Sequence, residues 1–176
     1  MSGDYERDGV MELKEDEHIE DMYLTFSVAD EEYAVSISYV TEIVGLQKMV
    51  EVPDVPEYIK GVINLRGKVI PIMDVRLRFG LPEIDYHDRT CIIVLEVDEV
   101  FTGLVVDAVS EVVEIAPENI TPPPSFRKGA GDSVIRGMGK RDRRVSIILD
   151  VNRLLYADQV RVDAGMETQP ELAQAA

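Results

Sequence analysis

The sequence contains no tryptophan and a single cysteine, and aromatic residues make up 6% of its 176 residues. One cysteine, Cys91, cannot form a disulfide framework within the chain, which fits a reducing compartment. With so few aromatic rings, the core must consist mainly of valine, isoleucine and leucine, since apolar residues make up 45% of the chain. This composition favours β-strands, because β-branched side chains pack well on a pleated sheet.

Positive charge is also scarce, because 18 lysines and arginines stand against 34 acidic residues and the net charge is −16 at pH 7. Nonspecific attraction to nucleic acid or to an anionic membrane is therefore disfavoured. No apolar run approaches the roughly 18 residues of a membrane span, and the N-terminus lacks the basic and then apolar layout of a signal peptide. We expect a soluble, cytoplasmic protein with no nucleic-acid partner and no direct membrane insertion.

Much of the negative charge lies at the N-terminus, where residues 1–21 hold nine acidic residues against Arg7 and Lys14. A like-charged segment with few apolar residues cannot bury enough surface to fold by itself. We therefore predict a disordered acidic arm over residues 1–21. The apolar pattern fades again near the C-terminus, and residues 157–176 are predicted to form a flexible or weakly helical tail.

Residues suited to catalysis or metal binding are sparse. His18 and His87 have no cysteine, histidine or acidic residue at metal-ligand spacing, and no phosphate-binding glycine loop is present. Cys91 lies in an apolar run, where a thiol packs as a small hydrophobic side chain rather than acting as a nucleophile. Asp74 and Asp150 could suggest a catalytic pair, yet each stands where a helix N-cap is expected. We expect no enzymatic activity, no metal and no cofactor.

The clearest local signal is the stretch at residues 58–80, which reads YIKGVINLRGKVIPIMDVRLRFG. Two β-branched runs flank a glycine-containing turn, which is typical of a β-hairpin. Pro71 cannot donate to a sheet ladder, so the second strand is expected at a sheet edge or with a bulge. Asp74 is predicted to cap a short helix that ends at Gly80.

This unit occurs twice. A shift of 76 residues places Asp74 on Asp150, and a shift of 69 places the run VTEIV at 40–44 on VSEVV at 109–113. The difference of seven residues between the two shifts is the size of a loop insertion, here in the proline- and glycine-rich stretch 121–133. Two related subdomains are therefore predicted.

The other apolar runs predict further strands, at residues 22–28, 33–37, 90–97, 101–106, 134–138 and 145–149. Apolar residues at helical spacing over 37–44 predict a short helix with Ser36 as its cap and Gly45 at its end. Asp107 is expected to cap a similar turn in the second half, and Asp150 to cap a closing helix.

Mainly β composition with frequent turns indicates small barrels or sandwiches. We predict two pseudo-symmetric, five-stranded β-barrel subdomains with a few short helices. The first barrel spans about residues 22–80 and the second about 90–156, and an exchange of elements between them stays open.

Two groups of charged residues need interpretation. The second hairpin carries basic residues at and near its tip, namely Arg127, Lys128, Arg136, Lys140, Arg141, Arg143 and Arg144. They form either a solvated turn or a docking site for an acidic partner or for the acidic arm. A nucleic-acid site would need interleaved aromatic residues, and only Phe126 is close. Glu42 and its repeat mate Glu111 either face solvent or border an apolar groove between the barrels.

The sequence resembles the CheW family of chemotaxis coupling proteins in three stretches, DEEYAVSISYVTEIVG, the central 23-residue stretch quoted above, and GLVVDAVSEVVEI. The resemblance runs from about Tyr23 to Leu155, and its NLRG-x-x-x-P-x-x-D core is specific. It implies two small five-stranded barrels with pseudo-twofold symmetry and no catalytic activity. It also implies that the protein links the cytoplasmic tips of methyl-accepting chemoreceptors to the regulatory domain of a CheA-type histidine kinase.

The resemblance also implies which residues bind each partner. The receptor-binding residues would be Val40, Glu42, Ile43, Arg66, Val109 and Val112. The kinase-binding residues would be Gly61, which holds the backbone close at a junction, and Phe126, which resembles a residue that assembles kinase and coupling protein into rings. Thr121 replaces a frequent basic residue, and the loop RKGAGDS at 127–133 departs from the family pattern.

Three alternative functions stand beside this one. A CheW-like scaffold of a receptor–kinase pathway outside chemotaxis fits the same residues. A nucleic-acid-binding barrel that uses the basic residues of 127–144 is disfavoured by the net charge and the few aromatic residues. An enzyme is the least favoured, because no active site is evident.

Overall fold

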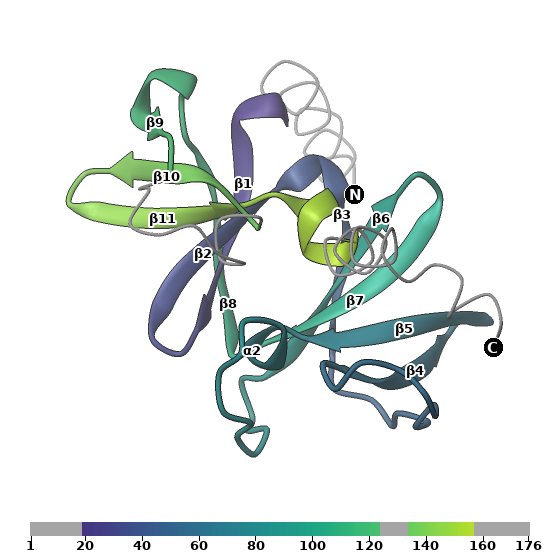
Figure 1. Ribbon diagram of the computed structural model, residues 1–176. Coiled ribbons are helices and arrows are strands. Elements are labelled where there is room, and N and C mark those ends of the chain that lie inside the picture. The colour runs from purple at the N-terminus through teal and green to yellow at the C-terminus, as the bar shows by residue number, and fades with distance from the viewer. Residues whose placement is uncertain (1–18, 124–133, 157–176) are drawn as a thin grey trace, which may run out of the picture.

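A computed structural model defines residues 19–123 and 134–156 (Figure 1). Within them, a six-stranded and a five-stranded sheet lie side by side. The strands are β1 (Met22–Val28), β2 (Glu31–Ser36), β3 (Val40–Gly45), β4 (Ile59–Leu65), β5 (Lys68–Asp74), β6 (Cys91–Val97), β7 (Val100–Val106), β8 (Ala108–Glu114), β9 (Ile120–Thr121), β10 (Ile135–Arg141) and β11 (Arg144–Leu149). The helices are short, namely η1 (Ile19–Asp21), η2 (Ile37–Tyr39), α2 (Val75–Arg78), η3 (Pro117–Asn119) and one at 151–156. The prediction of a mainly β protein with two subdomains and short helices is confirmed.

The two halves of the chain are interleaved. The strand order is β8-β1-β2-β11-β10-β9 in one sheet and β3-β6-β7-β5-β4 in the other. In each sheet, hairpins from the two halves meet in a parallel pair, β11 with β2 and β5 with β7. The barrels predicted at 22–80 and 90–156 therefore do not coincide with the sheets, because β1–β2 and β6–β7 each join strands of the other half.

The internal repeat is reproduced in the hydrogen bonding. The Asp74 N–H donates to the Tyr58 carbonyl at 2.7 Å, and one repeat later the Asp150 N–H donates to the Val134 carbonyl at 2.9 Å. The hairpins β4–β5 and β10–β11 also carry a register shift at the same place, near the start of the first strand. The two halves are therefore related in structure as well as in sequence.

The helix predicted over 37–44 is wrong beyond Tyr39. Ser36 does cap a 3-10 helix, with its Oγ accepting from the Ser38 N–H at 3.3 Å, but the chain then continues as β3. The spacing of the apolar residues fits a helix, yet most of them are β-branched and their backbone pairs with β6. Pairing with β6 therefore outweighed the helical spacing, and the segment forms a strand.

The capped turn predicted after Asp107 is wrong for the same reason. The residues that follow form β8, which pairs with β1. The Asp107 carboxylate accepts a hydrogen bond from the Ala29 N–H at 2.8 Å, in the turn between β1 and β2. The acidic residue therefore stabilises a contact between distant segments.

The central hairpin and its cap are confirmed. The β4 and β5 strands form the predicted hairpin, and Asp74 Oδ1 accepts from the N–H groups of Arg76 at 2.9 Å and Leu77 at 3.4 Å. Gly80 follows α2 with a φ of 81°, the left-handed conformation expected after a helix.

The expectation for Pro71 is wrong. The β5 strand is not at an edge, because it lies between β4 and β7. A bulge is present, but on β4, between Ile59 and Gly61. Pro71 lies one residue before the first β5 residue that pairs with β7, so its missing N–H falls just outside that ladder.

Within the ranges that the structure describes, three clusters of buried side chains form the core. The largest lies between the sheets and takes side chains from both, among them Phe26 and Val35 from one sheet and Ile93 and Leu104 from the other. A second cluster belongs to the five-stranded sheet and a third to the six-stranded sheet. Because the central cluster is shared, the two sheets pack as one body.

Some predictions concern residues outside the described ranges. These are the disorder of the acidic arm up to residue 18, the contact of Phe126 and the form of the tail 157–176. The last residues of the predicted arm, Ile19–Asp21, form a 3-10 helix, and the Ile115 N–H donates to its final carbonyl at 2.9 Å. These three residues therefore belong to the fold.

Candidate functional site

Three predicted receptor-binding residues lie on β3, at the edge of the five-stranded sheet. Val40 is half-buried against the central cluster, Glu42 is half-buried, and Ile43 is 44% exposed. A register shift between Val40 and Glu42 leaves Thr41 as an extra residue opposite β6. This edge strand therefore presents a carboxylate beside an exposed aliphatic side chain.

Arg66 lies at the tip of the β4–β5 hairpin, in the left-handed conformation with a φ of 51°. Its guanidinium donates to the Glu42 carboxylate, and the two side chains are 68% and 32% exposed. An exposed pair of this kind contributes about 0–1 kcal/mol to stability. The structure thus brings these two predicted residues together in a pair that a partner can reach.

Val109 and Val112 lie on β8, at the edge of the six-stranded sheet. Val109 packs against the same central cluster as Val40, and Val112 is 47% exposed, much like its repeat mate Ile43. The two edge strands therefore repeat one pattern, a half-buried valine followed by an exposed aliphatic residue.

The carboxylates of the two edge strands are both paired with arginines. Glu111, the repeat mate of Glu42, lies 3.8 Å from both Arg141 Nη2 and Arg144 Nη1. In each case the arginine lies at the tip of a hairpin, β4–β5 for Arg66 and β10–β11 for the other two. Each edge strand thus carries a carboxylate paired with an arginine of its own sheet.

Cys91 connects the two edge strands. It pairs with Gly45 at the end of β3, and its thiol accepts a hydrogen bond from the backbone of Val109 on β8. Burial raises the pKa of this thiol, and the hydrogen bond opposes the rise. Cys91 packs against the central cluster, as predicted for a small hydrophobic side chain.

The basic tip of the second hairpin is partly neutralised within the fold. Arg141 is 17% exposed and donates to Glu32 at 3.0 Å, and the Ser146 hydroxyl donates to the same carboxylate. Arg144 is largely exposed and lies 3.7 Å from Glu32. Arg141 is therefore neither solvated nor free to dock, whereas Arg144 remains accessible.

Gly61, predicted to contact the kinase, is buried in β4 with a φ of 148°. A Cβ atom at this position would lie 2.4 Å from the carbonyl oxygen of Val50. Val50 and Val62 exchange two backbone hydrogen bonds of 2.9 Å, so the connector that follows β3 runs along the edge of β4. This close approach agrees with the backbone role expected for Gly61, while its kinase contact remains a prediction.

The connector completes an exposed apolar strip, which consists of Val50, Val62, Val69 and Pro71. Val50 and Pro71 both lie directly opposite Val62, so the three side chains share one face. Val69 is two residues from Pro71 on the same strand and points to that face as well. Val50 and Val69 are strongly exposed.

An ion pair that the sequence did not suggest ties α2 to the first hairpin. Arg76 Nε lies 3.2 Å from Asp107 Oδ1 and Nη2 lies 2.9 Å from Oδ2, while the Ala29 N–H donates to the same carboxylate. Burial raises the pKa of Asp107, but the hydrogen bonds from Arg76 and Ala29 outweigh it and hold the pKa below its usual value. The carboxylate thus joins α2, the β7–β8 junction and the β1–β2 turn.

We expect Asp107→Asn to lower the free energy of unfolding at pH 7 by about 1–2 kcal/mol, since the Arg76 guanidinium loses its negatively charged partner. The pKa of Asp107 is lower in the folded than in the unfolded chain. Its contribution is therefore complete above the unfolded pKa and is lost as the pH falls through the folded pKa. Urea unfolding of both proteins from pH 7 down to about pH 2.5 should show the difference shrinking. A difference that stays constant would mean that the charge contributes nothing.

Asp74 and Asp150 are helix caps, as predicted. Asp150 Oδ1 accepts from the Arg153 N–H at 3.0 Å, and Asp74 accepts from the Tyr86 hydroxyl at 2.8 Å in addition to its helix. Burial and then this hydrogen bond raise the pKa of Tyr86 well above its usual value.

Within residues 19–123 and 134–156, no group of three or more histidine, cysteine or acidic side chains could hold a metal ion. No helix in these ranges is long and apolar enough to cross a membrane.

The acidic partners of Arg141 and Arg76 were not predicted from the sequence. Glu32 and Arg141 are 109 residues apart, and Arg76 and Asp107 are 31 apart. Local patterns carry no information about such distant pairs. The one available signal was the density of basic residues at 140–144, which indicated a need for acidic partners without identifying them.

Comparison with known proteins bears on this arrangement. A family model described as the CheW-like domain matches residues 22–159. Chemotaxis protein CheW of Klebsiella aerogenes is 35% identical over 138 residues, which cover 78% of this chain and 83% of that protein. Chemotaxis protein CheW of Bacillus subtilis is 36% identical over 132 residues, which cover 75% and 85%.

A solved structure agrees with these matches. The scaffolding protein TtCheW from Thermoanaerobacter tengcongensis superposes with a TM-score of 0.71 at 36% identity, covering 76% of this chain and 91% of that one. Together the matches support the role of a chemotaxis adaptor. Since the family model spans all the strands from β1 to β11, the chain belongs to the CheW-like family.

Proposed function

We propose that this protein is a non-catalytic chemotaxis adaptor that couples the cytoplasmic tips of methyl-accepting chemoreceptors to the regulatory domain of a CheA-type histidine kinase. The observation that carries the proposal is the repeated edge-strand pattern on β3 and β8, in a chain of the CheW-like family. The protein would act in the cytoplasm, recruited to membrane receptor arrays, and would need no cofactor.

The receptor side of the proposal rests on β3 and β8. An amphipathic receptor helix can lay an apolar stripe against the exposed side chains of Ile43 and Val112. When the guanidinium of Arg66 releases Glu42, it can bind a receptor carboxylate through two parallel hydrogen bonds, because the group is planar. To transmit a signal, this surface must bind one receptor state better than another.

The kinase side rests on the apolar strip of Val50, Val62, Val69 and Pro71. Exposed contiguous apolar side chains at a sheet edge are typical of protein–protein contacts. Gly61 lies beneath this strip and keeps the connector in place. Binding of both partners at once would hold receptor and kinase at high effective concentration.

Calorimetry tests the kinase side. We expect the full chain to bind the regulatory domain of its cognate kinase with one-to-one stoichiometry and a dissociation constant on the order of 1 μM. Val69→Asp should weaken this binding about tenfold or more, because it places a charge within the apolar strip.

Val112→Asp is the matched control, an exposed valine changed in the same way on the receptor side. It should leave kinase binding unchanged and weaken binding of the receptor tip. Equal effects of both variants on both partners would contradict the assignment of separate surfaces. No binding to any CheA-type kinase of the source cell would point to a receptor–kinase pathway outside chemotaxis.

A further inference from the structure

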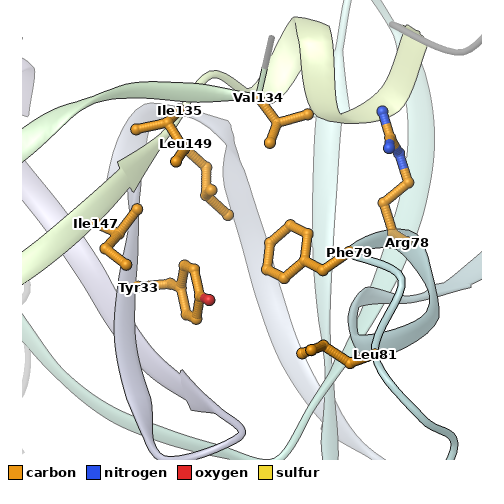
Figure 2. A pocket seen from close by; sticks show the side chains of 8 residues that line it. All are labelled: Tyr33, Arg78, Phe79, Leu81, Val134, Ile135, Ile147 and Leu149. Carbon is orange, nitrogen blue, oxygen red and sulfur yellow. The ribbon is translucent and has the colours of Figure 1, made fainter. Parts of the chain in front are cut away.

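A pocket of about 290 Å³ lies between the six-stranded sheet and the end of α2 (Figure 2), and none of its lining residues belongs to β3, β8 or the apolar strip. One wall comes from β2, β11 and β10, where Tyr33 pairs with Ile147, and the other from the end of α2. It is lined by Tyr33, Arg78, Phe79, Leu81, Val134, Ile135, Ile147 and Leu149. Most of these side chains are apolar, and the volume, near the lower end of ordinary ligand pockets, suits a single large side chain.

The internal repeat places a larger side chain at the equivalent position of the first half. Val134 lies at the pocket, and its repeat mate is Tyr58, with the same backbone hydrogen bond to the following cap residue. The Tyr58 ring packs against the central cluster, and Arg78 Cζ lies 5.3 Å from its centroid. In the first half this position thus carries an aromatic ring, whereas in the second half it carries a valine. The pocket thus lies beside a position that carries a ring in the first half and a smaller side chain in the second.

The walls of the pocket suit an aromatic guest. The Tyr33 and Phe79 rings are 5.1 Å apart between centroids and tilted by 37°, so two aromatic rings form part of the lining. A further ring can pack on them offset-stacked or edge to face. Figure 2 shows the Tyr33 hydroxyl on the side of its ring that faces Phe79 and Leu81. Among the described residues, this hydroxyl has no hydrogen-bond partner, and it is not one of the fully buried polar atoms. A guest with a hydroxyl of its own can therefore form one hydrogen bond in an otherwise apolar site.

We propose that this pocket binds the side chain of a tyrosine presented by a protein partner, in the place that Tyr58 occupies in the repeat-related half. Burial of one ring by itself gives a dissociation constant on the order of 10 mM, which is too weak to retain a free metabolite. The same ring is sufficient as an anchor within a larger protein interface, where a few buried aromatic residues dominate binding. The proposal goes beyond the receptor and kinase contacts and does not depend on them.

The test uses the full chain with ¹³C-labelled isoleucine, leucine and valine methyl groups, titrated with N-acetyl-tyrosinamide. Saturable shifts are expected for Ile135, Ile147 and Leu149, while the methyl groups of Ile43 and Val112 stay in place. N-acetyl-phenylalaninamide should bind several-fold more weakly, and N-acetyl-leucinamide should not saturate. Tyr33→Phe should remove the preference for tyrosine over phenylalanine, because the hydrogen bond is lost.

Val134→Tyr supplies the ring from the chain itself and should weaken probe binding about tenfold or more without lowering the melting temperature. Val69→Tyr, an exposed valine changed in the same way, is the matched control and should bind the probe as before. If Val134→Tyr fails to fold, Ile147→Phe narrows the pocket from the opposite wall. The proposal would be overturned if a folded pocket variant bound N-acetyl-tyrosinamide as the original chain does, or if N-acetyl-leucinamide bound equally well. It would also be overturned if free p-cresol bound while the capped tyrosine did not.

Discussion

Replacing Gly61 with alanine is expected to lower the free energy of unfolding by about 2–4 kcal/mol. The added Cβ would lie 2.4 Å from the carbonyl oxygen of Val50, and a φ of 148° is a conformation that side chains disfavour. A backbone carbonyl cannot move aside alone, so the connector must shift. Val50 would then leave the apolar strip, and we expect kinase binding to fall about tenfold or more. Urea unfolding and calorimetry measure the two effects.

Gly45→Ala is the control for this prediction, since no atom lies within 4 Å of a Cβ placed there. It should change the free energy of unfolding by less than about 1 kcal/mol and leave kinase binding intact. A loss of kinase binding in Gly61→Ala with unchanged stability would contradict the role of a backbone support. It would indicate that the glycine itself contacts the kinase.

Arg66→Ala should weaken binding of the receptor tip about tenfold or more while stability stays nearly constant. The Arg66–Glu42 pair is exposed, so its loss should change the free energy of unfolding by less than about 1 kcal/mol. The binding loss is larger because the guanidinium would exchange Glu42 for a receptor carboxylate in a surface that becomes dry on binding. Titration of a receptor-tip fragment and thermal unfolding give the two values.

Arg144→Ala is the matched control, an exposed arginine at the tip of the repeat-related hairpin. It should alter receptor binding by less than about twofold, because the receptor-side residues include no arginine from this turn. A large drop in melting temperature for Arg66→Ala without a binding defect would make Arg66 a structural residue. Equal binding losses in both variants would extend the receptor surface to the second hairpin.

The correct predictions of local structure came mostly from interactions between residues that are close in the chain. The β4–β5 hairpin, the Asp74 cap and Gly80 are all where the sequence indicated, because a turn and a helix cap need residues that are near one another in the chain. The repeat was visible for the same reason, since it compares one local unit with another. The pairing of Glu42 with Arg66 was not predicted, although both residues were expected at the receptor side.

The spacing of apolar residues predicted the wrong structure where a short run fits both a helix and a strand. The run 40–44 has apolar residues at helical spacing, but it is rich in β-branched side chains and an unpaired edge of β6 was available. The same error occurred after Asp107, where β8 pairs with β1. Both segments carry predicted receptor-binding residues, so the shape of that surface could not be foreseen.

The sequence by itself determined a β-rich chain, two related halves, the hairpins with their caps and the family to which the chain belongs. Only the tertiary structure decided that each sheet draws hairpins from both halves and that Arg141 pairs with Glu32. It also decided that the connector lies against Gly61 and that a pocket remains beside Val134. These features depend on contacts between residues far apart in the chain, which no local pattern specifies and which form because they bury the shared core.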